Sequence, residues 1–228
     1  MVYCKSSITS AGFAIDQYDG NGSFETGGSD IKSTSLGVYY TRIFESGHYY
    51  DFTFRYGRIY GDWSSYDADA AAIAGPITKS DFGVNTASVS AEYGYRANIG
   101  DNGFYIEPQV ELIAGYVSSG SDTTNAGDAV YMDSARHFIA RAGIALGQRS
   151  ANLNYYLRFS YFHNFGGDLN MEYAGVAIKA ESAKNWYELT AGLGWAIQNR
   201  FYFYLELSKF YRDIANSLNF SLGFRVTL

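Results

Sequence analysis

Apolar and polar residues alternate along most of the chain with a period of two. The clearest stretch is 217–228, SLNFSLGFRVTL, in which every second residue is apolar and the residues between are Ser, Asn, Gly, Arg or Thr. This period is that of a β-strand with one apolar and one polar face. Nine further stretches repeat it, so the sequence predicts ten strands and no long helix. They are 7–18, 34–44, 49–63, 85–98, 103–118, 136–148, 153–165, 185–198, 201–211 and 217–228.

The connections between these strands mostly alternate between short and long. Outer-membrane barrels have short periplasmic turns and longer exterior loops, so the alternation favours such a barrel over a soluble sandwich. Within the first long connection, the sequence DGNG at 19–22 predicts a turn. The tight connections are 45–48, 98–102, 149–152 and 198–200, the long ones are 19–33, 64–84, 119–135 and 166–184, and the last, 212–216, is short.

The polar faces carry Glu and Arg in mid-strand, with almost no Lys. Opposite charges are expected to pair inside a narrow lumen, where a soluble sandwich would present Lys and Thr to water. Glu107 and Glu111 lie four residues apart on one face and resemble a catalytic carboxylate pair, but we expect them to pair with Arg96 or Arg141. The predicted lumen-lining residues are Arg55, Glu92, Arg96, Glu107, Glu111, Arg141, Arg158, Glu188, Glu206 and Arg225.

Charge, hydropathy and cysteine content further narrow the class of protein. The formal net charge of -6 argues against a nucleic-acid partner, which requires a basic surface. The sequence contains no run of 18 consecutive apolar residues, so it predicts no transmembrane helix. The mean hydropathy of -0.18 is compatible with a membrane barrel, because lipid-facing and lumen-facing residues average out. Cys4 is the only cysteine, which excludes an intramolecular disulfide and a cysteine metal cluster.

The sequence predicts no metal site and no cofactor, and we do not expect an enzyme. His48, His137 and His163 fall on three different elements, without the spacing of metal ligands. His163 and Asp168 at the outer rim leave one enzyme alternative open, a protease of the outer-membrane barrel type. Pro108, on the apolar face of a strand, predicts a bulge.

Glycines and aromatic residues have structural roles in this interpretation. Gly192 and Gly194 lie inside a strand and are expected to admit bulky lumen neighbours such as Tyr or Trp. Aromatic residues at strand ends are expected to form girdles at the two membrane interfaces. These girdle residues are Tyr49, Phe104, Tyr116, Tyr187, Phe201 and Tyr211.

Motifs spread along the chain resemble the C-terminal translocator domain of autotransporters, the type V secretion proteins. The segment SLGVYYTRIFESGHYYDFTFRYGRI resembles paired strands of that family, and SAEYGYRANIGDNGFYIEPQVEL resembles its Glu-Tyr-Gly-Tyr and Glu-Pro-Gln strands. RAGIALG, FGGD, WYELTAGLGW and LGFRVTL also fit. The last eight residues match the family's assembly signal, carried here by Ser221, Gly223, Val226 and Leu228. The family usually ends in Phe or Trp, so Leu228 departs from the pattern.

The resemblance implies an all-β fold, an antiparallel transmembrane β-barrel of the outer-membrane type in a Gram-negative-type bacterium. Family barrels have twelve strands and a pore helix, so we expect residues 1–228 to be one β-barrel domain that lacks the first two strands and the helix. The first ten residues also lack the apolar core of a signal peptide. Closure of ten strands requires 7–18 to pair with 217–228.

The implied function is a translocator that anchors or exports an N-terminal passenger. Its partners are outer-membrane lipid, the barrel-assembly machinery and a passenger outside this chain. A stand-alone outer-membrane pore or structural barrel is the alternative, besides the rim protease.

Overall fold

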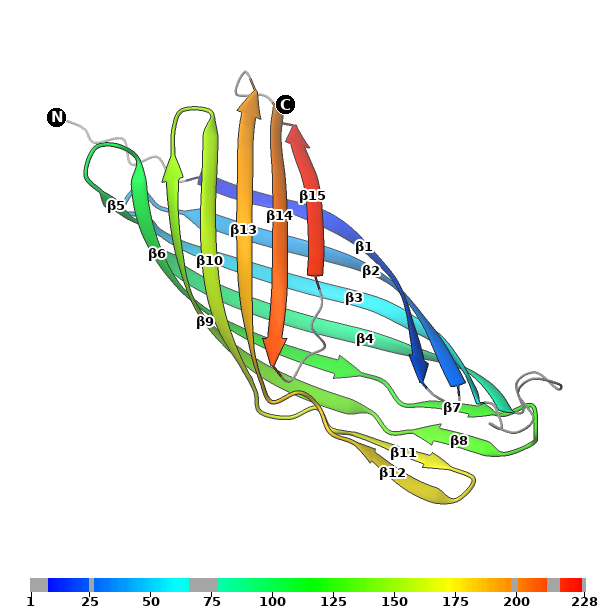
Figure 1. Ribbon diagram of the computed structural model, residues 1–228. Helices are drawn as coiled ribbons and strands as arrows, with labels where there is room; N and C mark the ends of the chain where they lie inside the picture. The colour runs from blue at the N-terminus through cyan, green and yellow to red at the C-terminus, as the bar shows by residue number, and fades with distance from the viewer. Residues whose placement is uncertain (1–7, 25–26, 66–77, 198–200, 213–217, 227–228) are drawn as a thin grey trace.

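The computed structural model describes residues 8–24, 27–65, 78–197, 201–212 and 218–226, and every regular element in them is a β-strand. Ten long strands form one strongly curled antiparallel sheet (Figure 1). No helix long and apolar enough to cross a membrane occurs in the described part of the chain. In sheet order, the ten strands are β1 (Ile8–Phe24), β2 (Gly27–Ile43), β3 (His48–Ser65), β4 (Thr78–Tyr95), β6 (Phe104–Val117), β9 (Ala135–Arg149), β10 (Leu153–Asn164), β13 (Asn185–Ile197), β14 (Phe201–Arg212) and β15 (Leu218–Val226).

The ten predicted strands are confirmed, and so is the all-β antiparallel fold of the outer-membrane type. Each long strand pairs with its neighbour along the chain, which is the order that hairpin connections produce. The connections 44–47, 100–103 and 150–152 are tight and lie at one end of the sheet, where β1 begins and β15 ends (Figure 1). The fourth predicted tight turn, 198–200, lies outside the described residues. We call this end the tight-turn end and the opposite one the exterior end.

The predicted long loops are partly wrong, because strands extend into them. The turn predicted at 19–22 lies inside β1, which runs in register with β2 from Ile8↔Ile43 to Phe24↔Gly27. Likewise, β3 continues to Ser65 and β4 starts at Thr78. Backbone hydrogen bonds, rather than apolar side chains, extend these ladders, so the period-two signal fades before the strands end.

Two further predicted loops form a separate four-stranded sheet at the exterior end. The strand order in this sheet is β12-β11-β8-β7. Hydrogen bonds to Asp122 of β7 attach the sheet to β4: Asp122 accepts one from Ser80 Oγ at 2.6 Å and one from the Asp81 amide at 2.8 Å. A two-residue loop joins β11 to β12, with Ala174 and Gly175 at positive φ, as a tight hairpin turn requires. The strands are β7 (Gly120–Thr123), β8 (Ala129–Met132), β11 (Leu169–Tyr173) and β12 (Val176–Ala180).

The ladder is interrupted once opposite Pro108. There, β4 ends at Tyr95 and the short β5 (Ala97–Ile99) resumes the pairing with β6. The register is the same on both sides, Gly94↔Gln109 and Ala97↔Ile106, so no residue is inserted. The predicted bulge is therefore wrong: proline removes a ladder hydrogen bond without changing the register.

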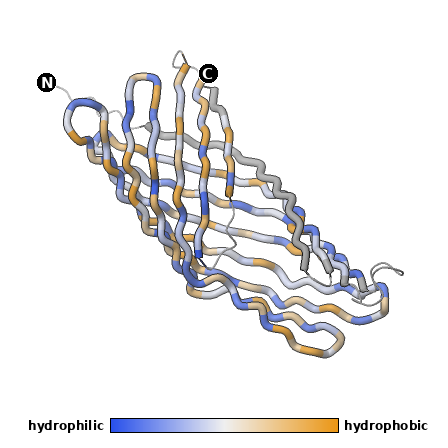
Figure 2. The backbone as a smooth tube through the Cα atoms, viewed as in Figure 1, coloured by the Kyte–Doolittle hydropathy of each residue, from blue (hydrophilic) through white to orange (hydrophobic). Residues whose placement is uncertain are grey.

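The two faces of the curled sheet differ in polarity, and the alternation is visible along the strands that Figure 2 colours by hydropathy. The outward face carries large apolar residues that remain exposed, such as Phe52, Val89, Leu112, Leu157 and Leu193. The inward face carries the buried polar residues, among them Glu107, Arg141, Ser160, Glu188 and Thr190. This arrangement is inverted relative to a soluble β-protein and is the one that a lipid-embedded barrel requires.

The described ladders leave two sheet edges, β1 and β15. Each long strand between them has a partner on both sides, and no ladder in the described residues joins β1 to β15. The pairing of 7–18 with 217–228, which closure by ten strands requires, is therefore not formed among these residues.

Asp168 anchors the base of the β11–β12 hairpin. Its Oδ1 accepts hydrogen bonds from Lys184 Nζ at 2.9 Å and the Ser182 amide at 3.1 Å, and its Oδ2 pairs with Lys179 Nζ at 3.1 Å. These donors, with the Lys184 hydrogen bond first, hold the pKa of the Asp168 carboxyl well below its ordinary value of 3.8. A lowered folded-state pKa means that the stabilisation is present at neutral pH and is lost only as the pH falls below that ordinary value.

Asp168→Asn is expected to speed amide hydrogen exchange in β11 and β12 at neutral pH, since it removes both lysine ion pairs. In the unsubstituted chain, the protection of these amides relative to their unfolded exchange rates should fall only below about pH 4, where the carboxyl of the opened segment takes up a proton. Glu181→Gln, at an exposed carboxylate in the same connection, is the matched control and should leave exchange unchanged. Equal exchange in the D168N variant and the unsubstituted chain would contradict this role.

Candidate functional site: a charged network on the inner face

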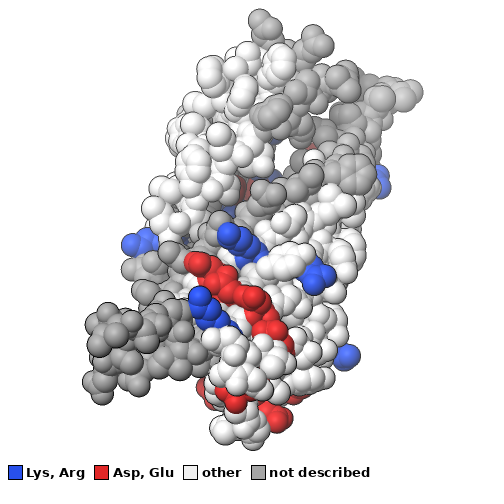
Figure 3. Space-filling model, turned by 90° about the vertical axis from the view of Figure 1, so that its right-hand side faces the viewer, with Lys and Arg blue, Asp and Glu red and all other residues white. Residues whose placement is uncertain are grey.

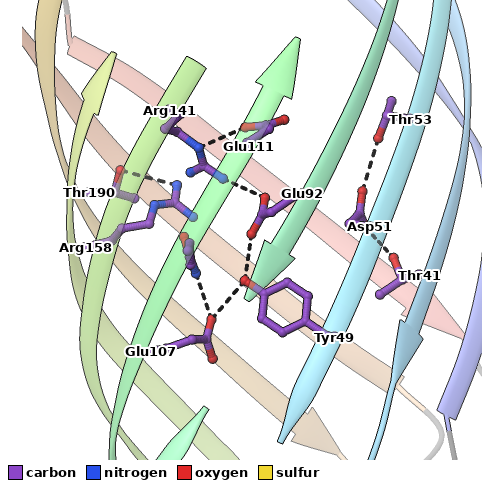
Figure 4. Close-up of polar contacts among 11 residues, drawn as sticks. Thr41, Tyr49, Asp51, Thr53, Glu92, Glu107, Glu111, Arg141, Arg158 and Thr190 are labelled. Carbon is purple, nitrogen blue, oxygen red and sulfur yellow. Dashed lines mark hydrogen bonds and ion pairs between the residues drawn. The ribbon is translucent and has the colours of Figure 1, made fainter. Parts of the chain in front are cut away.

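Arg141 on β9 is the centre of an ion-paired network on the inner face (Figure 4). Its Nη2 donates to Glu92 Oε2 at 2.6 Å, and its Nε lies 2.8 Å from Glu111 Oε2. Glu92, Glu111 and Arg141 are consecutive register partners on β4, β6 and β9. The Arg141 side chain is only 6% exposed, so the two carboxylates replace its lost hydration.

A second group of contacts centres on Glu107 and joins the first through Tyr49. The Tyr49 hydroxyl lies 2.6 Å from Glu92 Oε1, to which it donates, and 3.3 Å from Glu107 Oε1. Gln109 Nε2 donates to Glu107 Oε1 at 2.7 Å, and Arg96 Nε donates to Glu107 Oε2. The predicted ion pairing of Glu107 and Glu111 with Arg96 and Arg141 is thus confirmed, and neither carboxyl is left as an unpaired acid or base.

Arg158 on β10 extends the network toward β13 and β14. Its Nη2 lies 3.5 Å from Thr190 Oγ1, which is 2.8 Å from Ser208 Oγ. On the next row of the same face, the Tyr156 hydroxyl donates to Glu206 Oε1. Hydroxyl groups therefore continue the polar path across strands that carry few charges.

Two other predicted lumen residues, Glu188 and Arg55, lie on the same face. Glu188 is buried on β13, and Arg55 lies on β3 beside Gly37, where an added Cβ would be 3.1 Å from Arg55 Cγ. The side chain of Arg225 lies outside the described residues. In the assembly signal, the backbone of Ser221, Gly223 and Val226 belongs to β15, whereas the Val226 side chain and Leu228 are outside the described part.

Several inner-face residues escaped the sequence prediction. Tyr49 is not a girdle residue, because its side chain lies among Glu92 and Glu107 on the inner face. Asp51 accepts hydrogen bonds from Thr41 and from Thr53, the latter at 3.2 Å. The signal for both was strand parity: odd positions of β3 face inward, as Arg55 does, and this assigns 49 and 51 to the same face.

The other girdle residues lie on the outward face, as predicted. Phe104, Tyr116, Phe201 and Tyr211 are exposed, and Tyr187 stacks on Phe159 with 5.7 Å between ring centroids.

No group of residues in the described part of the chain has the arrangement of a metal site. His163 and Asp168, the pair behind the protease alternative, contact different groups. His163 Nδ1 lies 2.8 Å from Asn185 Oδ1, and its ring packs edge-on against Phe165 at 4.5 Å, whereas Asp168 is held by two lysines. His163 is thus held by packing and a hydrogen bond, and Asp168 by ion pairs, each with a different set of neighbours.

A cavity of about 910 Å³, lined by both polar and apolar residues, opens inside the curl at the tight-turn end. Its lining includes Tyr39, Tyr49, Arg96, Asn154 and Tyr202. Seen from the side, the surface of the molecule carries one band of acidic side chains with basic side chains beside it, and the rest of this side is mostly uncharged (Figure 3).

Inner-face tyrosines lie directly over glycines of the neighbouring strand, as predicted for Gly192 and Gly194. A Cβ at Gly192 would lie 2.2 Å from Tyr156 Cζ, and one at Gly194 would lie 2.1 Å from the Tyr202 hydroxyl. Glycine is needed here because the ring occupies the space of the missing side chain.

Gly192→Val is expected to destabilise the chain by roughly 1–3 kcal/mol, because the new methyl groups displace the Tyr156 ring and with it the hydrogen bond to Glu206. Urea unfolding in detergent micelles measures the change. Ala191→Val, the adjacent outward-facing position, is the control and should change stability little. Equal stability of the two variants would show that the Tyr–Gly contact is not tight.

Comparison with known proteins agrees with this arrangement. The family model described as the autotransporter beta-domain matches residues 5–208. The chain belongs to the autotransporter β-domain family. Domains of this family are outer-membrane barrels of Gram-negative bacteria.

Relatives of this β-domain include the pertactin autotransporter of Bordetella parapertussis, 28% identical over 176 residues, which are 75% of this chain and 18% of pertactin. The chain therefore spans about a fifth of that relative's length. Among solved structures, the β-domain of the Bordetella autotransporter BrkA superposes with a TM-score of 0.70 at 19% identity, covering 98% of this chain and 93% of that one. The translocator domain of NalP from Neisseria meningitidis gives 0.72 at 13% identity, covering 96% and 74%. At these identities, the two structures show a shared fold.

Proposed function

We propose that this β-domain is a translocator, which anchors in the outer membrane and exports an N-terminal passenger polypeptide. The observation that carries the proposal is the family match over residues 5–208, on a sheet whose apolar residues face outward and whose charged residues face inward. The inner network then lines the lumen. Its ion pairs and hydroxyl contacts keep the wall hydrated and engage Glu92, Glu107 and Glu111, so that these carboxylates are less available to a passing chain. The proposal includes no catalytic step.

The lumen-lining set of this proposal is Arg55, Glu92, Arg96, Glu107, Glu111, Arg141, Arg158, Glu188, Glu206 and Arg225, to which we add Tyr49 and Asp51. Arg225 is included from its position in the alternation of β15. The other residues are included because they share the inner face.

We further propose that the barrel-assembly machinery recognises the last eight residues, with Ser221, Gly223, Val226 and Leu228 as the assembly signal. The support is the spacing of polar, glycine and apolar positions on an edge strand, which leaves backbone groups of β15 available for pairing.

The test is export in a Gram-negative host. The whole chain is expressed behind a cleavable secretion signal and an epitope, and the accessibility of the epitope to external protease is measured together with folding of the barrel, seen as a heat-dependent shift on a gel. A translocator places the epitope at the cell surface. A folded barrel whose epitope stays protected would overturn the export function. Val226→Asp, made in the same chain, should abolish the folded form if the assembly signal is correctly assigned.

A stand-alone pore is the second candidate, favoured by the cavity inside the curl at the tight-turn end. It predicts ion conductance of the purified chain in planar bilayers without export of the epitope. Export together with conductance supports the translocator, because a polypeptide path is also an ion path.

A further inference from the structure

Six residues form a cluster at the tight-turn end: five lie on the outward face of β2, β3 and β4, and the sixth lies in the turn that follows β2. We call it the interface cluster; it consists of Arg42, Phe44, His48, Tyr50, Tyr93 and Tyr95. Arg42, Tyr50 and Tyr93 are successive register partners across the three strands, and His48 is the partner of Tyr95 in the next row. The strand pairing therefore places Arg42 and His48 next to a group of aromatic side chains.

The rings are in mutual contact. His48 Nδ1 lies 2.6 Å from the Tyr93 hydroxyl, and the His48 ring lies 4.5 Å from that of Tyr95. Tyr50 is 5.2 Å from Tyr93 and 5.9 Å from Phe44. The Arg42 guanidinium lies 4.8 Å from the centre of the Phe44 ring. These contacts hold the Arg42 side chain against the sheet and fix the orientation of the His48 ring.

The cluster is exposed and borders the apolar surface. Tyr50, Tyr93 and Tyr95 are 42%, 36% and 38% exposed. Phe52 and Phe54 continue the same face of β3 toward the middle of the strand. In an outer-membrane barrel this border is the depth of the lipid headgroups, and the tight-turn end faces the periplasm.

We propose that the interface cluster binds the headgroup phosphate of a phospholipid in the periplasmic leaflet. Arg42 supplies a permanent positive charge. His48 supplies its Nε2 atom, because the other ring nitrogen, Nδ1, contacts the Tyr93 hydroxyl. None of the six residues is acidic, so the charge is complementary to phosphate. The tyrosine rings lie where the glycerol and the upper acyl chains would pack, because an amphipathic ring suits that depth.

The proposal is tested by native mass spectrometry of the detergent-purified whole chain with added phosphatidylethanolamine. The unsubstituted chain should retain one phospholipid and should retain no diacylglycerol, which has the same chains without the phosphate. The double variant Arg42→Gln, His48→Gln should retain the phospholipid roughly tenfold less, the effect of losing a charge-assisted hydrogen bond.

Arg58→Gln is the matched control. Arg58 also faces outward on β3, 4.9 Å from the Tyr60 ring, but toward the exterior end, so its replacement removes the same charge and the same kind of contact. R58Q should retain the lipid as the unsubstituted chain does. Heat-dependent gel mobility verifies that each variant is folded.

Three results would overturn the proposal. The double variant retains the phospholipid fully, or diacylglycerol is retained equally, or excess inorganic phosphate displaces the lipid, which would show a site for free phosphate. Loss of lipid binding with export intact separates this site from the translocator function.

Discussion

Arg141→Gln is expected to destabilise the folded chain by about 3–5 kcal/mol, because it leaves two carboxylates facing each other on the inner face without their cation. Glu92 and Glu111 both pair with Arg141, and their side chains are 19% and 16% exposed. Glutamine keeps much of the length and some hydrogen-bonding capacity of arginine, so the loss reports mainly on charge.

Urea unfolding of the chain folded into lipid vesicles measures this effect. Arg149→Gln removes an exposed arginine of the same strand and should change stability little. Adding Glu92→Gln to the Arg141→Gln variant should restore part of the loss, and the double-mutant cycle gives the coupling of the pair. If R141Q and R149Q are equally stable, the network is solvated rather than structural.

The sequence predicted the strands well where apolar residues alternate with polar ones. From Ala140 to Leu146, the apolar residues at even positions face outward, and so do their register partners on β10. The exterior strands were missed for a physical reason. In β7, with the sequence GSDT, no apolar residue marks a face, and the strand exists because its backbone pairs with β8.

The Glu and Arg residues of the inner network could be predicted from the sequence, but its Tyr, Thr and Ser residues could not. Glu and Arg in mid-strand have few places to lie except inside a membrane barrel. A tyrosine fits equally well at the lipid interface, in the lumen or over a glycine, and only the register decides. Tyr49 lies over Gly94, its register partner, and this contact places its hydroxyl beside Glu92. The residue type of Tyr49 carries no information on this choice.

The inverted polarity of the sheet has one decisive test. Leu157→Arg is expected to cost about 2–4 kcal/mol of folding free energy in a bilayer, the cost of an arginine at the midplane. Leu157 lies in the middle of β10 between Leu146 and Ala191 and is 59% exposed. In a water-soluble protein the same substitution at so exposed a position would change stability by less than about 0.5 kcal/mol.

Val176→Arg supplies the comparison within the same chain. Val176 is also an exposed apolar residue, at 61%, but it lies on β12 in the small exterior sheet, beyond the ends of the long strands. Its replacement should leave folding into vesicles unchanged, whereas Leu157→Arg should lower both the folded yield and the urea midpoint. Equal tolerance of the two arginines would mean that β10 does not face lipid. A strong effect at both positions would place the exterior sheet in the bilayer as well, because only a hydrocarbon environment makes an exposed arginine this costly.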